Sequence, residues 1–276
     1  MAKHPAELFG YPLEVASDEA KLARNKYWCP FVDQKCNKQS RLINYPMGVC
    51  SVHYGDRIIA LSPRRFLQDK FIFKDIADQY FKTRNNLLVF KEIGVPNIGT
   101  FDYVMVKHKA LSSEIEDFVV IEFQTAQTTG TGQLVQALKD GMEGQDIKGR
   151  NYGFGLNLAD IWKRSFTQIL NKGIVLENWG NRIYWVIQEA VYQNFLDRYN
   201  LNEMGYNQSH KTVFAVYDIK EQKDKYELFR TRFESSTINS LFNAFRKNPN
   251  IPPRDAFIDK LKTRLKDKMH LKLRLD

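Results

Sequence analysis

The sequence predicts a mixed α/β fold, in which a central sheet flanked by helices follows a small module that contains cysteines. The 276 residues are 43% hydrophobic and 26% charged, which is the balance of a globular protein with a sizeable core. Helix and strand patterns alternate between positions 71 and 188. All three cysteines lie earlier, between positions 29 and 50. We therefore expect an N-terminal module over residues 1–68 and a main domain over residues 69–276 with a helical C-terminal extension.

The main domain is expected to begin with a helix and three strands. Apolar residues from Phe71 to Phe81 follow helical spacing, and this helix should end near Asn85. Segments rich in β-forming residues follow, separated by turn formers, so an antiparallel meander is the simplest arrangement. The expected strands cover residues 87–93, 101–107 and 117–124.

The second half is expected to alternate helices and strands. A helix from Leu156 should close at Lys172-Gly173, since glycine often follows the last helical residue. Prolines separate the last two helices. The expected strands cover 182–188, 211–219 and 226–233, and the expected helices cover 156–170, 190–199, 237–247 and 254–270.

The charge balance favours a polyanionic partner. Lysine and arginine total 41 against 32 acidic residues, which gives a net charge of +9. No uncharged apolar run approaches the roughly 18 residues of a membrane-spanning helix, and the N-terminus lacks the apolar core of a signal peptide. We expect a cytoplasmic protein without a membrane segment.

The cysteines suggest a metal site. Cys29, Cys36 and Cys50 are clustered, and their odd number in a chain without an export signal argues against a disulfide framework. The alternative interpretation is that these cysteines pack as small apolar groups.

Three residues in the predicted strands suggest nuclease chemistry. Asp102 lies near the start of the second strand, and Glu122 and Gln124 lie near the end of the third. Strand alternation places Glu122 and Gln124 on one face, and an antiparallel neighbour can bring Asp102 beside them. Two carboxylates suit Mg²⁺, which activates water and offsets charge in phosphodiester hydrolysis. A glutamine amide can hold that water or a phosphate oxygen by hydrogen bonding.

An ordinary explanation of the same residues stays open, because acidic residues are common at sheet ends. Glu92, at the end of the preceding strand, is either a further metal-facing carboxylate or a solvated strand end.

The order of elements matches the PD-(D/E)xK nuclease core in outline, and four motifs resemble the NotI family of restriction endonucleases. These motifs are the cysteine-bearing start, GTFDYV, IEFQT followed by TTG, and NLADIWKRSFTQIL. The resemblance covers about Phe9 to Gln188 and includes glutamine in place of the usual lysine. It implies a type II restriction endonuclease with Asp102, Glu122 and Gln124 as catalytic residues, Asp102 and Glu122 binding Mg²⁺, and a homodimer that cuts double-stranded DNA.

The resemblance also implies a structural iron or zinc held by four cysteines. Here Ser62 stands at the expected position of the fourth cysteine, and serine is a poor ligand for such a site. Three cysteines and a histidine form a familiar zinc-type set, so His53 is the preferred fourth ligand and His4 a more distant candidate. The alternative is that the module has lost its metal.

Several basic segments are candidates for phosphate contacts or are simply solvated faces. They are Arg64-Arg65, Lys163-Arg164, and the C-terminal residues Lys260, Lys262, Arg264, Lys266 and Lys268. Two other functions are considered: a repair or structure-selective nuclease on the same core, and a DNA-binding protein without catalysis. The first requires divalent metal, whereas the second should bind DNA unchanged without it.

Overall fold

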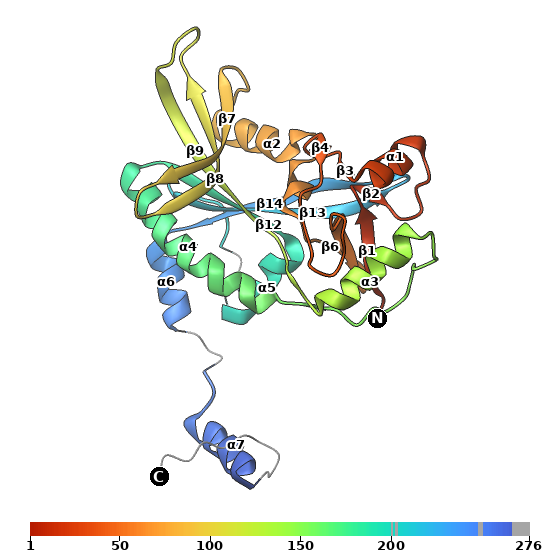
Figure 1. The fold of residues 1–276 in the computed structure, drawn as a ribbon. Helices are drawn as coiled ribbons and strands as arrows, with labels where there is room; N and C mark the ends of the chain where they lie inside the picture. Colours follow the sequence, from red (N-terminus) through yellow and green to blue (C-terminus); the bar gives the residue numbers. More distant parts are fainter. Residues whose placement is uncertain (200, 202–203, 248–250, 267–276) are drawn as a thin grey trace.

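A mixed six-stranded sheet forms the centre of the computed structural model, which describes residues 1–199, 201, 204–247 and 251–266 (Figure 1). The strand order is β14-β13-β12-β9-β8-β7. β12 is parallel to both of its neighbours, and the other pairs are antiparallel. The strands are β7 (Leu87–Val95), β8 (Gly99–His108), β9 (Ile115–Gln124), β12 (Arg182–Gln188), β13 (Thr212–Gln222) and β14 (Lys225–Ser236).

Helices cover both faces of this sheet because its central strands are buried on both sides. In β9, Val120 points into the core shared with α3, α4, α5 and α6, whereas Val119 and Ile121 point into the core shared with α2 and η1. Figure 1 shows α4 and α5 along one face and α2 near the other. The helices are η1 (Pro63–Lys70), α2 (Phe71–Tyr80), α3 (Thr131–Met142), α4 (Leu158–Trp179), α5 (Glu189–Tyr199) and α6 (Ile238–Arg246).

The N-terminal segment forms a second, four-stranded sheet in the order β2-β1-β5-β6. Leu8 and Val52 of this sheet belong to the same hydrophobic cluster as Trp185 of the central sheet. The division into residues 1–68 and 69–276 stays a prediction. The elements of this segment are β1 (Lys3–Leu8), β2 (Tyr11–Pro12), α1 (Asp18–Lys26), β3 (Trp28–Cys29), β4 (Gln34–Lys35), β5 (Val49–Tyr54) and β6 (Arg57–Ala60).

The predicted meander is confirmed, because β7, β8 and β9 are consecutive antiparallel neighbours. The predicted helix end at Lys172-Gly173 is wrong, since α4 continues to Trp179. A Cβ at Gly173 would overlap the side chain of Ile238, so this glycine permits close packing of α4 against α6 rather than ending the helix. Helix α3 was not predicted; its glycine Gly141 packs against Leu8.

The C-terminal helix α7 (Arg254–Lys266) has no buried residues and projects away from the body of the molecule (Figure 1). The predicted continuation to residue 270, with Lys268, lies outside the described residues. The short strands β10 (Thr128–Thr129) and β11 (Gly155–Leu156) pair with each other. None of the described helices combines the length and apolarity needed to cross a membrane.

Candidate active site

Two adjacent strands bring Asp102 and Glu122 together. The antiparallel register pairs Tyr103 of β8 with Ile121 of β9, so Asp102 and Glu122 follow as opposite neighbours. Asp102 Oδ2 accepts a hydrogen bond from the amide of Phe123 at 2.9 Å, and Glu122 Oε1 accepts one from the amide of Asp102 at 3.3 Å. The two carboxylates are therefore held at one point by the backbone of the opposite strand.

Glu122 is nearly sealed from solvent, with 2% of its side chain exposed. Burial raises its pKa to about 7, and the charge of Asp102 contributes to this rise. Lys172 acts in the other direction by hydrogen bonding and charge. A further positive charge beside Glu122 would therefore favour its ionised form near neutral pH.

Lys172 comes from α4 and was not predicted as a site residue. Its Nζ lies 2.8 Å from each carboxylate oxygen of Glu122 and 2.7 Å from the carbonyl oxygen of Thr100. Its role is hidden in the sequence, because Lys172-Gly173 has the pattern of a helix end. With α4 continued, the helical spacing of Ser165, Gln168 and Lys172 gives three polar residues on one side of the helix.

The same side of α4 fixes the amide of Gln124. Its Oε1 accepts a hydrogen bond from Ser165 Oγ at 2.8 Å, and its Nε2 donates to Gln168 Oε1 at 3.3 Å. Glu122 and Gln124 thus face α4 together, as strand alternation predicted. The structure brings all three predicted catalytic residues to the junction of β8, β9 and α4.

This junction lies in a groove of about 1160 Å³. Asp102, Glu122 and Gln124 line the groove, and the N-terminal segment lines it from another side with Lys38 and Arg64 among its residues. The site is therefore open to a large substrate.

Glu92 also lines the groove, but its side chain is 67% exposed and pairs with Lys91 at 2.9 Å. Glu92 is therefore a solvated residue at the rim of the groove, and its ion pair in the described structure is with Lys91.

The donor chemistry of the carboxylate pair fits a hard divalent cation. With both acids ionised, Asp102 and Glu122 carry two negative charges against the single positive charge of Lys172. Carboxylate oxygens are the ligands that Mg²⁺ prefers, with water and phosphate oxygens completing the shell. Within the described residues no group of three or more histidine, cysteine, aspartate or glutamate side chains forms a ready metal cage.

The three cysteines line the same groove as free thiols. Burial raises the pKa of Cys50, and the neighbouring Glu7, Cys29 and Cys36 raise it further, so the thiols lie within electrostatic range of one another. The predicted cysteine metal cluster is not seen among the described side chains. The amide of Ser62 donates to the carbonyl oxygen of Cys50 at 3.2 Å, and Ser62 lines the groove together with the three cysteines.

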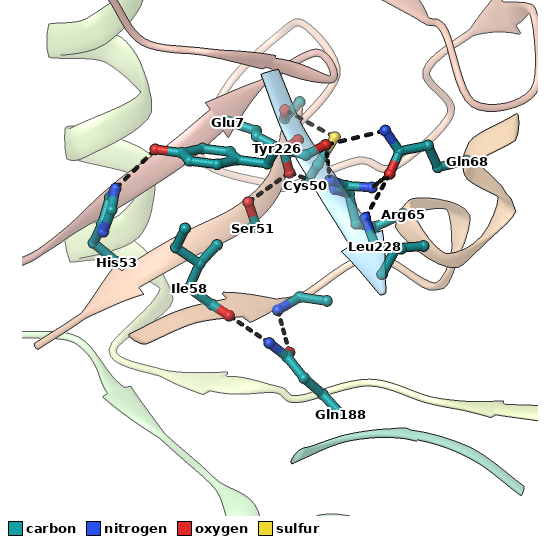
Figure 2. A network of polar contacts seen from close by, with 12 residues as sticks. Glu7, Cys50, Ser51, His53, Ile58, Arg65, Gln68, Gln188, Tyr226 and Leu228 are labelled. Carbon is teal, nitrogen blue, oxygen red and sulfur yellow. Dashed lines mark hydrogen bonds and ion pairs between the residues drawn. The ribbon is translucent and has the colours of Figure 1, made fainter. Parts of the chain in front are cut away.

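His53 and His4 lie together, away from the cysteine ligand set expected for them. His53 Nε2 lies 3.0 Å from the hydroxyl of Tyr226 (Figure 2). The centroid of the His4 ring lies 4.7 Å from that of the His53 ring. Cys50 and His53 are three residues apart on β5, and an odd separation on a strand places side chains on opposite faces. The structure therefore does not bring either histidine to the thiols.

The predicted basic segments divide into buried and exposed residues. Arg65 is fully buried in an ion pair with Glu7, so it is not available to phosphates. Arg64 and Arg164 line the groove, and Lys163 is exposed. The described basic residues of α7 are exposed: Lys260, Lys262, Arg264 and Lys266.

The chain matches the family model of Restriction endonuclease NotI over residues 8–231, which is more than half of its length. A search among curated proteins found no match. The matched segment includes the groove, the carboxylate pair and most of the central sheet. The chain therefore belongs to the NotI family of restriction endonucleases and is a site-specific DNA hydrolase.

Proposed function

We propose that the protein is a type II restriction endonuclease that requires Mg²⁺ and cuts double-stranded DNA with Asp102, Glu122 and Gln124. The observation that carries this proposal is the pair of carboxylates that strand amides hold together at a groove, with Glu122 paired to a single cation, Lys172, among the described residues. Asp102 and Glu122 would hold the cation. When bound, the cation lowers the pKa of water and offsets charge on the phosphate.

Gln124 has a different task because its amide carries no charge. Ser165 donates to its Oε1, and one N–H of its Nε2 donates to Gln168. The second N–H of Nε2 is the one that can donate to a phosphate oxygen or to the oxygen of the attacking water. Its fixed orientation lowers the entropy lost when the substrate is positioned.

Arg64 and Arg164 support the placement of duplex DNA in the groove. Both are cationic and both line it. Phosphate contacts of this kind set the register of the duplex and make affinity fall as salt rises.

The assembly that fits this function is a two-fold symmetric homodimer. A palindromic duplex has two equivalent scissile phosphates, and one active site cuts one strand. Sedimentation of the DNA complex should report two chains per duplex, and one chain per duplex with coupled cutting of both strands would exclude the symmetric dimer.

The structural iron or zinc implied by the resemblance stays a prediction. Three thiols near one another support it, whereas the serine at the fourth position and the distant histidines do not fit a complete ligand set. Elemental analysis of the purified protein would decide it, with about one metal per chain expected for a structural site.

Digestion of a sequenced phage genome with purified protein and Mg²⁺ tests the proposed activity. Discrete fragments support a site-specific restriction enzyme, whereas a smear or cutting confined to branched DNA supports a repair or structure-selective nuclease. Asp102→Ala protein is the control for contaminating nuclease. DNA binding without any cutting in Mg²⁺ or Mn²⁺ would overturn the proposal.

A further inference from the structure

We infer that Lys172 is a positioning residue of this active site, which holds the Glu122 carboxylate beside Asp102 and balances one of their two charges from helix α4. The inference rests on the proposed function, because it takes Glu122 as a ligand of the divalent cation. No motif used in the sequence analysis included this lysine.

The geometry uses the whole hydrogen-bonding capacity of the ammonium group. A lysine has three N–H donors, and Lys172 Nζ has three acceptors: both oxygens of Glu122 at 2.8 Å and the carbonyl oxygen of Thr100 at 2.7 Å. Its side chain is 6% exposed. Lys172 therefore acts through Glu122 rather than by contacting DNA.

The position of these acceptors explains what the lysine holds. Thr100 lies on β8 two residues before Asp102, and Glu122 lies on β9. One side chain from α4 thus joins both strands at the point where the two carboxylates meet. Small displacements of catalytic groups lower the reaction rate strongly. The hydrogen bonds of Lys172 to both strands therefore preserve the geometry that cleavage needs.

The charges of the two carboxylates give the Lys172–Glu122 ion pair an electrostatic role as well as a geometric one. Each of the two carboxylates accepts a hydrogen bond from a backbone amide of the opposite strand, and Glu122 is buried. Without Lys172, two like charges would be held together with less compensation, and the Glu122 carboxylate would lose two of its hydrogen bonds. The carboxylate is then expected to turn away from Asp102.

The central test compares Lys172→Met and Lys172→Arg in steady-state cleavage with Mg²⁺. We expect Lys172→Met to lower kcat by about 100-fold or more while KM for DNA changes by less than about threefold, as for other lost electrostatic contacts in active sites. Lys172→Arg keeps the charge, and its kcat should be at least about tenfold higher than that of Lys172→Met. Lys225→Met, which removes an exposed lysine paired with Glu227, is the matched control and should cut normally.

A second measurement does not depend on cleavage. In the metal-free protein, Glu122→Gln leaves the buried ammonium without its anionic partner and should lower the midpoint of urea unfolding. The double variant Glu122→Gln with Lys172→Met removes both charges and should recover much of that loss. This pairwise recovery also applies if Lys172→Met alone folds poorly.

The outcomes separate this inference from the proposed function. If Asp102→Ala and Glu122→Ala do not cut but Lys172→Met cuts at the normal rate, the inference is overturned and the proposed function stands. If Asp102→Ala and Glu122→Ala both cut normally, the proposed function fails. Equal loss of kcat in the methionine and arginine variants, with additive unfolding effects, would reduce Lys172 to ordinary packing and also overturn the inference.

Discussion

Glu7 and Glu122 are both buried and paired with cations, but only Glu122 lies beside a second carboxylate and lines the groove. Glu7 of β1 accepts hydrogen bonds from Arg65 Nε at 2.8 Å and from Ser51 Oγ at 2.6 Å (Figure 2). Glu122 of β9 accepts from Lys172 at 2.8 Å. Burial is the main cause of a raised pKa in both glutamates. The second-largest influence has opposite signs: the charge of Arg65 lowers the pKa of Glu7, whereas the charge of Asp102 raises the pKa of Glu122 further.

This difference distinguishes the Glu7–Arg65 ion pair from the candidate active site. One carboxylate and one guanidinium cancel, and Arg65 is further held by the carbonyl oxygen of Tyr226 at 2.7 Å. Two carboxylates and one ammonium leave a negative charge, and they face a groove. Two carboxylates with one ammonium group keep a net negative charge, so binding of a cation beside them is expected to be favourable.

The largest effect is expected from neutralising the unbalanced pair. Asp102→Asn should lower cleavage by about 10³-fold or more, because the cation loses a charged ligand that supports several kcal/mol of transition-state stabilisation. Urea unfolding and DNA affinity measured with Ca²⁺ should change little. Cleavage within about tenfold of normal would show that Asp102 does not hold the cation.

Breaking the balanced pair should affect folding instead. Arg65→Met leaves Glu7 buried without its partner and should cost about 3–5 kcal/mol of unfolding free energy. Cleavage per folded molecule should stay close to normal. A variant that unfolds normally but has lost cleavage would show that this pair also serves the active site, and the comparison would then be wrong.

The pH dependence of cation binding should report the raised pKa of Glu122. Because this pKa is about 7, a divalent cation must displace a proton below that pH, and its affinity should fall by up to about tenfold per pH unit. Above pH 7 the carboxylate is already ionised, so the affinity should level off. Calorimetry with Ca²⁺ in buffers of different ionisation enthalpy should detect proton release at pH 6 that fades by pH 8.5; release that is the same at both pH values would contradict the assignment.

The smallest effect concerns the orientation of Gln124. Ser165→Ala removes one neutral hydrogen bond to its amide, which corresponds to about 0.5–1.5 kcal/mol, or a loss of up to about tenfold in kcat. Ser112→Ala, in an exposed loop, is the control. A loss as large as that of Asp102→Asn would mean that Ser165 itself contacts the reacting groups.

Local pattern alone was sufficient for the strands that carry the carboxylates. Segments rich in β-forming residues over 101–107 and 117–124, joined by a polar stretch, predicted the meander, and side-chain alternation along the strands placed Asp102 beside Glu122 and Gln124. The structure has the same pairing. This part was predictable because a strand's side-chain period is fixed by the backbone, and an antiparallel neighbour follows from a short connection.

Only the tertiary structure decided which other groups meet that strand end. Gly173 reads as a helix end in the sequence, but contact with Ile238 makes it a packing position, and α4 then carries Lys172 to Glu122. His53 reads as a ligand of the cysteines, but the pleat of β5 turns it to Tyr226. Periodicity describes one element at a time, whereas partners between elements depend on packing and charge compensation that the sequence does not place in space.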